Sequence, residues 1–100
     1  MKMIMIFCRE KLERDVLQLL NSQGVRGYTV MSGLGGKGLT GVVSEHGLIE
    51  RNVGFLVVLD DTQATALAEA VKQLYKTLLE RQGGEEVPIK AFVLPCDVIV

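Results

Sequence analysis

One glycine-rich run in this chain has the residue spacing of a ligand-binding motif. Gly33-Leu34-Gly35-Gly36-Lys37-Gly38 fits the pattern G-x-G-x-x-G. In dinucleotide-binding proteins this pattern opens a helix whose N-terminus faces the pyrophosphate. Here the next residues, Leu39 to Ser44, are rich in glycine and β-branched residues and carry no helical stripe, so the context excludes such a unit. Two interpretations remain open: a nest of backbone N–H groups that binds an anion, and a flexible hinge.

His46 is the one histidine of the chain and follows Glu45 in the same glycine-rich region. With Cys8, Cys96 and four methionines it could supply soft ligands to a metal ion. Cys8 ends the first apolar segment and Cys96 follows the last one, so antiparallel pairing would place them toward opposite ends of a sheet. We therefore expect Cys8 to be a buried structural residue. No metal site is predicted, and His46 is kept as the alternative ligand.

The pattern of a catalytic site is absent from the sequence. No Ser–His–Asp, Cys–His or paired-carboxylate arrangement stands out, and a single histidine without an orienting partner is a poor general base. The sequence therefore predicts a protein that is not an enzyme and needs no cofactor.

Composition excludes further classes of function. Eleven Lys and Arg against twelve Asp and Glu give a formal net charge of −1, without the basic excess that nucleic-acid binding requires. No segment approaches the roughly 18 uninterrupted apolar residues of a membrane span. The apolar start of the chain, Met1 to Cys8, is too short for a signal-peptide core. We expect one cytoplasmic domain over residues 1–100.

The first half of the chain predicts a strand, a helix and a second strand. Met1 to Cys8 is a nearly continuous apolar run of strand length. A helix should follow, because its apolar residues fall at i, i+4, i+7 and i+8: Leu12, Val16, Leu19 and Leu20. It should end at Gly24, since glycine favours the left-handed conformation of a helix C-cap. Val25 to Ser32 is rich in β-branched and aromatic residues, as strands are. Residues 33–52 contain six glycines and no periodicity, which predicts a long functional loop.

The second half repeats this order of elements. Val53 to Leu59 is the strongest strand in the sequence, and Asp60 with Gln63 forms a capping-box pattern for the next helix. That helix has a buried stripe and should end before Gly83 and Gly84; its apolar residues are Ala64, Leu67, Val71, Leu74 and Leu78. Val87 to Leu94 is the last predicted strand.

The resulting order, strand–helix–strand–strand–helix–strand, predicts an α+β fold. Two right-handed βαβ halves give the ferredoxin-like βαββαβ arrangement: an antiparallel sheet, two helices on one face, and a long loop between strands 2 and 3. The opposite sheet face keeps apolar side chains, and a face of this kind needs a cover. A partner subunit is the simplest one.

Four stretches of the chain resemble the PII-like signalling proteins, the superfamily of nitrogen regulatory protein PII. Gly24 to Val30 is similar to the family's G-V-x-G-x-T-V strand, and Gly33 to Gly38 resembles the start of its T-loop. Phe55 to Ala68 resembles its third strand and second helix, and Ile89 to Pro95 its closing K-I-F-V-L-P strand. These stretches extend over almost the whole chain in the family's order.

The resemblance implies a non-enzymatic homotrimer that binds an adenine nucleotide as a small effector in clefts between subunits. Thr29 and the backbone of Gly33, Gly35 and Gly36 would face the adenine, Lys37 and Gly38 would complete the glycine-rich ligand-binding segment, and Lys90 would approach the phosphates. The T-loop would change order with the ligand and dock on a client, a transporter or a metabolic enzyme. Its partner-binding residues would be Leu39, Thr40, Val42, Val43, Glu45 and His46.

The chain also departs from the family pattern. The family's phosphate cradle, G-D-G-K, is replaced by Glu85 to Lys90, E-E-V-P-I-K, and the family's C-terminal arginines have no counterpart before Val100. We therefore expect ADP or AMP, or less favourably ATP, with loss of nucleotide binding left open. The alternative is a metal-binding trimer that resembles the CutA proteins or the PII-like partners of efflux systems.

Overall fold

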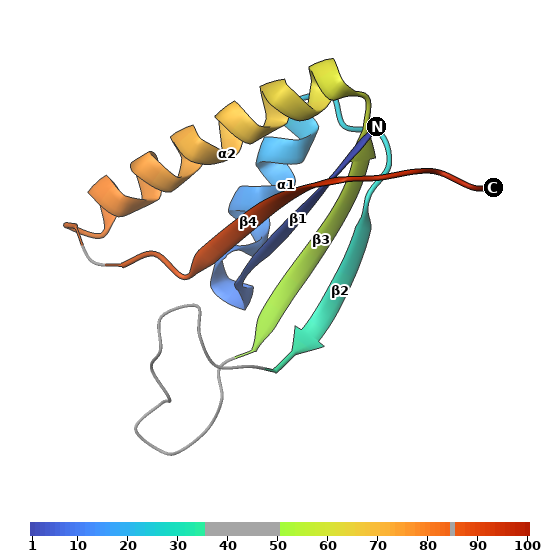
Figure 1. The fold of residues 1–100 in the computed structure, drawn as a ribbon. Helices are drawn as coiled ribbons and strands as arrows, with labels where there is room; N and C mark the ends of the chain where they lie inside the picture. The colour runs from blue at the N-terminus through green and yellow to red at the C-terminus, as the bar shows by residue number, and fades with distance from the viewer. Residues whose placement is uncertain (36–50, 85) are drawn as a thin grey trace.

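The computed structural model describes residues 1–35, 51–84 and 86–100. Its elements follow the predicted order. They are β1 (Lys2–Arg9), the 3-10 turn η1 (Glu10–Leu12), α1 (Glu13–Ser22), β2 (Thr29–Leu34), β3 (Asn52–Leu59), α2 (Asp61–Arg81) and β4 (Ile89–Pro95) (Figure 1).

The helices begin and end where local chemistry dictates. The Asp60 carboxylate accepts a hydrogen bond of 2.8 Å from the Gln63 backbone N–H, which caps the N-terminus of α2. Gly24 ends α1 at φ +69°, a conformation that favours glycine. The N–H of Val25 then bonds back to the Leu20 carbonyl, as in a Schellman motif, and Gly83 and Gly84 end α2 in the same way.

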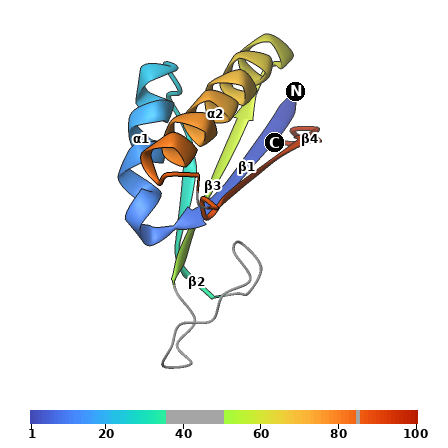
Figure 2. The same cartoon turned by 90° about the vertical axis from the view of Figure 1, so that its left-hand side faces the viewer.

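The four strands form one antiparallel sheet in the order β2-β3-β1-β4. Both helices lie on the same face of this sheet (Figure 2). Side chains alternate along the strands, so Ile4, Ile6 and Cys8 of β1 face the helices and are buried. The core formed between the two layers also contains Val53, Phe55, Val57, Val16, Leu20, Leu67 and Leu78. The predicted ferredoxin-like fold is confirmed.

Two strands, β2 and β4, begin clearly later than the sequence predicts. The second strand begins at Thr29 instead of Val25, because the Val25 N–H is used in the cap of α1. The fourth strand begins at Ile89 instead of Val87, because Val87 and Pro88 form a buried connection before it; the Ile89 N–H bonds to the Val87 carbonyl at 2.8 Å.

The sheet face away from the helices is apolar, as predicted. Three rows cross it in register: Thr29–Leu56–Met5–Phe92, Met31–Gly54–Phe7–Lys90, and Val58–Met3–Leu94. We call these residues the open face. Phe92 is 51% exposed, and Val58 and Leu94 are also exposed in the protomer. Among the described residues, no helix has both the length and the apolar character needed to cross a membrane.

Candidate functional site

Four of the predicted ligand-binding residues lie in the described part of the chain: Thr29, Gly33, Gly35 and Lys90. All four are exposed. Gly36, Lys37 and Gly38 lie outside the described residues. The same holds for the predicted partner-binding residues, which are Leu39, Thr40, Val42, Val43, Glu45 and His46.

Gly33 lies within β2, so the strand extends into the segment predicted to be a loop. It has φ +68°, and the pairing of β2 with β3 shifts register between Met31 and Leu34. A residue in this conformation at a register shift is typical of a β-bulge, where glycine is favoured. The bulge changes the direction of the chain at the base of the glycine-rich run.

The segment before Lys90 is anchored to the end of β1. The Arg9 backbone N–H donates to the Pro88 carbonyl at 3.1 Å, and Val87 and Pro88 are buried. A proline and buried carbonyls cannot supply the row of free N–H groups that a phosphate cradle uses. Directly after this anchored segment, the Lys90 ammonium is a described group that can neutralise a phosphate.

Lys90 and the other described ligand-binding residues lie at opposite edges of the sheet. Thr29, Gly33 and Gly35 belong to or follow β2, whereas Lys90 belongs to β4, and β3 and β1 separate the two strands. Three strand spacings of about 4.8 Å place β2 and β4 roughly 14 Å apart. The structure does not bring these residues together within one protomer.

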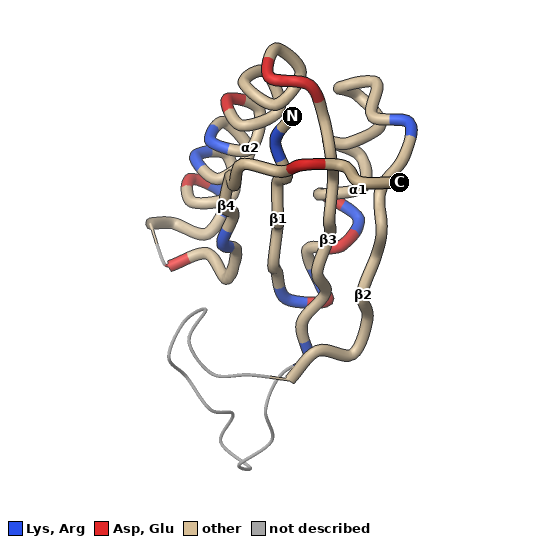
Figure 3. Tube along the Cα trace, turned by 45° about the vertical axis from the view of Figure 1, so that its right-hand side comes forward, with Lys and Arg blue, Asp and Glu red and all other residues tan. Residues whose placement is uncertain are grey.

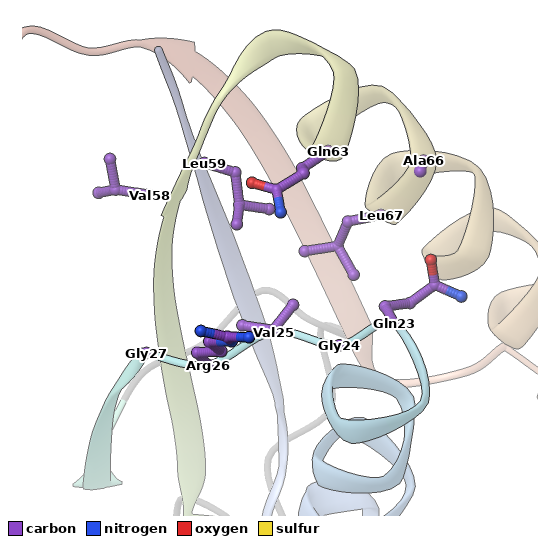
Figure 4. A pocket seen from close by; sticks show the side chains of 10 residues that line it. All are labelled: Gln23, Gly24, Val25, Arg26, Gly27, Val58, Leu59, Gln63, Ala66 and Leu67. Carbon is purple, nitrogen blue, oxygen red and sulfur yellow. The ribbon is translucent and has the colours of Figure 1, made fainter.

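A pocket of about 340 Å³ lies at the end of the sheet where β2 has not yet begun (Figure 4). Three segments form it: the α1–β2 connection, the end of β3 and the first turns of α2. Its residues are Gln23, Gly24, Val25, Arg26, Gly27, Val58, Leu59, Gln63, Ala66 and Leu67. We call it the β3-end pocket. Thr29 follows Gly27 by two residues, so the predicted adenine contact lies beside this pocket.

The β3-end pocket combines an apolar wall with polar groups. Leu59 and Leu67 supply apolar surface, and Arg26, Gln23 and Gln63 supply a cation and two amides, whereas the Val58 side chain points away to the open face (Figure 4). Because the pairing of β2 with β3 begins at Thr29 and Leu56, the end of β3 has no β2 partner in the described register. Successive strand residues direct their N–H and C=O groups to alternate edges, so one of Val58 and Leu59 directs both toward the pocket side. The pocket therefore offers one backbone donor and one backbone acceptor beside an apolar wall, an arrangement that can bind a flat heterocycle.

Sequence reasoning missed most of this pocket. The α1–β2 connection was predicted to be a strand, and Val58 and Gln63 were placed only as strand and cap residues. A usable signal was Gly24 together with Gly27, since two glycines so close to a predicted helix end disfavour an immediate regular strand.

Cys8 is a buried core residue, as predicted, with no exposed surface. Burial, reinforced by the charges of Glu13 and Asp15, raises the pKa of its thiol from 9.0 to about 12. Cys96 lies beyond the far end of the β1–β4 pair, so the two thiols do not share a site. Within residues 1–35, 51–84 and 86–100, no group of three His, Cys, Asp or Glu is placed to hold a metal ion.

Comparisons with known proteins agree with the resemblance. The model of the family described as nitrogen regulatory protein P-II matches residues 1–100. No curated protein sequence matches.

Solved structures with the same fold include a nitrogen regulatory PII-like protein, CPII, from Thiomonas intermedia K12. Its structure bound to ADP, AMP and bicarbonate has a TM-score of 0.65 and 22% identity, covering 93% of this chain and 86% of that one. The apo form has a TM-score of 0.66 and 18% identity, covering 93% and 85%. The form bound to ADP and bicarbonate has a TM-score of 0.66 and 22% identity, covering 93% and 82%.

Proposed function

Because this chain belongs to the nitrogen regulatory protein P-II family, we propose that it is a non-enzymatic signalling protein. It binds an adenine nucleotide between the subunits of a homotrimer in the cytoplasm and regulates a transporter or a metabolic enzyme through residues 36–50. The observation that carries this proposal is the placement of Thr29 and Lys90 at opposite sheet edges. A site that uses both residues is completed when the β2 side of one subunit lies near the β4 side of the next.

The open face supports assembly. Phe7, Leu56, Met5 and Phe92 lie in adjoining rows of this face, and half of the surface of Phe92 is exposed in the protomer. A continuous apolar surface on a 100-residue protomer is stabilised when other copies cover it. In a trimer the three open faces would turn inward, and the helices would remain outside.

The β3-end pocket supports adenine as the base. A purine needs an apolar wall for its ring and a donor–acceptor pair for its N6 and N1 positions. Leu67 and Leu59 supply the wall, and the exposed backbone at the end of β3 supplies the pair. Thr29, beside the pocket, adds a hydroxyl group.

The charges near the proposed cleft favour a nucleotide with few phosphate groups. Glu86 is exposed directly before the anchored Val87–Pro88 segment, and a carboxylate repels a polyphosphate. Lys90, which follows the same segment, provides one positive charge. We therefore propose ADP or AMP as the effector in preference to ATP. CPII, the protein of similar fold, has been solved with ADP and AMP bound.

Isothermal titration calorimetry with ATP, ADP, AMP and cyclic AMP, each with and without bicarbonate, tests the proposal. We expect saturable binding at one site per subunit, tightest for ADP or AMP. Bicarbonate is included because the CPII complex contains it. Absence of heat with all four nucleotides in both conditions would overturn nucleotide sensing, and the trimer would then require another ligand.

A further inference from the structure

One polar side chain of the β3-end pocket is directed toward the backbone that ends β3. Figure 4 shows the Gln63 amide extending from the first turn of α2 toward the end of β3, where Leu59 also lines the pocket. The amide of Gln23, the other one in the pocket, is directed instead toward the turn of α2 that contains Ala66 (Figure 4). Gln63 is therefore the amide that a ligand at the end of β3 would meet.

The Gln63 side chain is available to a ligand. Its backbone N–H donates to the Asp60 carboxylate at 2.8 Å and caps α2, and this bond does not involve the side chain. Within the described part of the chain, the side-chain amide of Gln63 forms no hydrogen bond, and the residue is exposed. The amide can therefore bind a ligand without disturbing the cap.

The charges around Gln63 favour an uncharged part of the ligand at this place. Figure 3 shows acidic positions at the junction of β3 and α2, and the sequence identifies them as Asp60 and Asp61. Both residues are exposed and lie within three positions of Gln63, and carboxylates repel phosphate groups. The base of a nucleotide bound in this pocket, rather than its phosphates, therefore lies beside Gln63.

We propose that Gln63 recognises the N6–N7 edge of adenine, an inference that rests on the adenine-nucleotide function proposed above. Its Oε1 accepts a hydrogen bond from one N6–H, and its Nε2–H donates to N7, the bidentate pair that a glutamine forms with adenine. The backbone at the end of β3 binds the other N6–H and N1, so the two sets of contacts do not compete. Gln63 is then a specificity-determining residue of the pocket.

The same edge of the base distinguishes adenine from guanine. Guanine presents two acceptors there, O6 and N7, so the amide oxygen of Gln63 would face an acceptor with no proton between them. An arginine has donors only and pairs well with that edge of guanine. Arg26 lies on the α1–β2 connection, which forms a different wall of the pocket from α2 (Figure 4). A preference for guanine would therefore indicate Arg26 as the recognising residue in place of Gln63.

The test compares ADP with 7-deaza-ADP, in which a C–H group replaces N7 and the ring keeps its shape. Isothermal titration calorimetry with the full native chain should give about five-fold weaker binding of 7-deaza-ADP, the effect of one lost hydrogen bond. Gln63→Leu keeps the approximate size of the side chain, so ADP should bind roughly ten-fold more weakly and the difference between the two ligands should disappear. Gln63→Glu keeps an acceptor for N6–H but has no donor for N7, so 7-deaza-ADP should bind more tightly than ADP.

Two variants serve as controls. Gln73→Leu, on α2 but outside this pocket, should keep the native ratio of the two affinities, and so should Gln23→Leu. Circular dichroism should show folded variants, because the cap of α2 uses only the backbone N–H of Gln63.

Equal affinity of the native chain for ADP and 7-deaza-ADP, an unchanged ratio in Gln63→Leu, or loss of the ratio in Gln23→Leu would overturn the role of Gln63. In each of these cases the native chain still binds ADP, so the proposed function stands without this residue. Tighter binding of GDP than of ADP would also overturn the role of Gln63, together with the choice of adenine. Failure of the native chain to bind ADP at all would overturn both proposals.

Discussion

Gly54 lies opposite Phe7 in the sheet, and a Cβ atom on Gly54 would come within 3.0 Å of Cε1 of that ring. The same atom would lie 2.9 Å from Cε of Met31 and 3.1 Å from Cδ1 of Leu34. Three side chains from two strands therefore meet over a residue that has none. Leu34 ends β2 at the base of the glycine-rich run, so the open face and the base of that run are in direct contact.

Substitution of Gly54 by alanine should disturb all three contacts. The Met31 methyl group lies closer than a real Cβ atom tolerates, but it is the movable end of a flexible side chain, whereas Phe7 and Leu34 must each give by a few tenths of an ångström. Overpacking of this kind should cost free energy of unfolding at the lower end of the usual range of about 1–3 kcal/mol. Urea denaturation at one fixed protein concentration measures it. Gly35→Ala is the matched control, since a Cβ atom there meets nothing within 4 Å. Equal stability of the two variants would contradict the packing described here.

A charge on the open face should prevent assembly without unfolding the protomer. Leu94 is 39% exposed and lies in the row with Met3 and Val58. In Leu94→Asp a trimer would have to bury an unpaired carboxylate, which costs several kcal/mol. Light scattering on a size-exclusion column should show a smaller species with native circular dichroism. Thr77→Asp, on the exposed side of α2, should assemble like the native chain. A trimeric Leu94→Asp variant would exclude the open face as the interface.

The cap of α2 gives a stability prediction with an internal control. Asp60→Ala removes the side-chain acceptor of the Gln63 N–H and should cost about 1 kcal/mol in the free energy of unfolding. Asp60→Asn keeps an oxygen acceptor and should cost less. Asp61→Ala removes an ion pair of 3.2 Å with the N-terminal amine, and should have a small effect because the pair is exposed. Thermal or urea unfolding of the three variants should give this order.

The fold could be predicted because local signals determine its elements. The Asp60 cap, the Gly24 and Gly83 termini and the period of the buried residues in each helix act within a few residues of sequence. The start of β2 was misplaced because Val25 and Tyr28 have strand-like side chains, while the backbone of Val25 completes the helix cap. A local hydrogen bond to Leu20 overrode the propensity of the side chain.

The site was less predictable because it depends on distances between segments. Thr29 and Lys90 were identified by resemblance, but their placement at opposite edges depends on the strand order β2-β3-β1-β4. The β3-end pocket joins Gly27 to Val58 and Gln63, which belong to two stretches of chain that are far apart in sequence and carry no joint motif. Side-chain types alone do not indicate such a pocket.

The pKa of Cys8 predicts a loss of stability at alkaline pH. Its thiol has a pKa of about 12 in the folded chain against 9.0 in the unfolded one, because burial disfavours the thiolate. The unfolded state therefore releases its proton first, and the free energy of unfolding falls as pH rises through the window from 9 to 12, by at most about 1.4 kcal/mol per pH unit. Below pH 9 this contribution is fully present. Cys8→Ala lacks the thiol, so the difference in unfolding free energy between it and the native chain should shrink between pH 8.5 and 10.5, measured by urea denaturation. A constant difference would contradict a buried, protonated thiol.

Subunit mixing tests whether the nucleotide site is shared between protomers. Thr29→Tyr should fill the space of the adenine, and Lys90→Glu should repel the phosphates, so each variant alone should bind ADP at least about ten-fold more weakly, a change of about 1.4 kcal/mol. If Thr29 of one subunit and Lys90 of the next form each site, unfolding the two variants together and refolding them at equal concentrations should restore about one site in four, because that fraction of neighbours contributes both native residues. Calorimetry would detect this fraction as a tight ADP site in the mixture. Should both residues act within one protomer, the mixture would contain no native site, and its titration would equal the sum of the two separate variants.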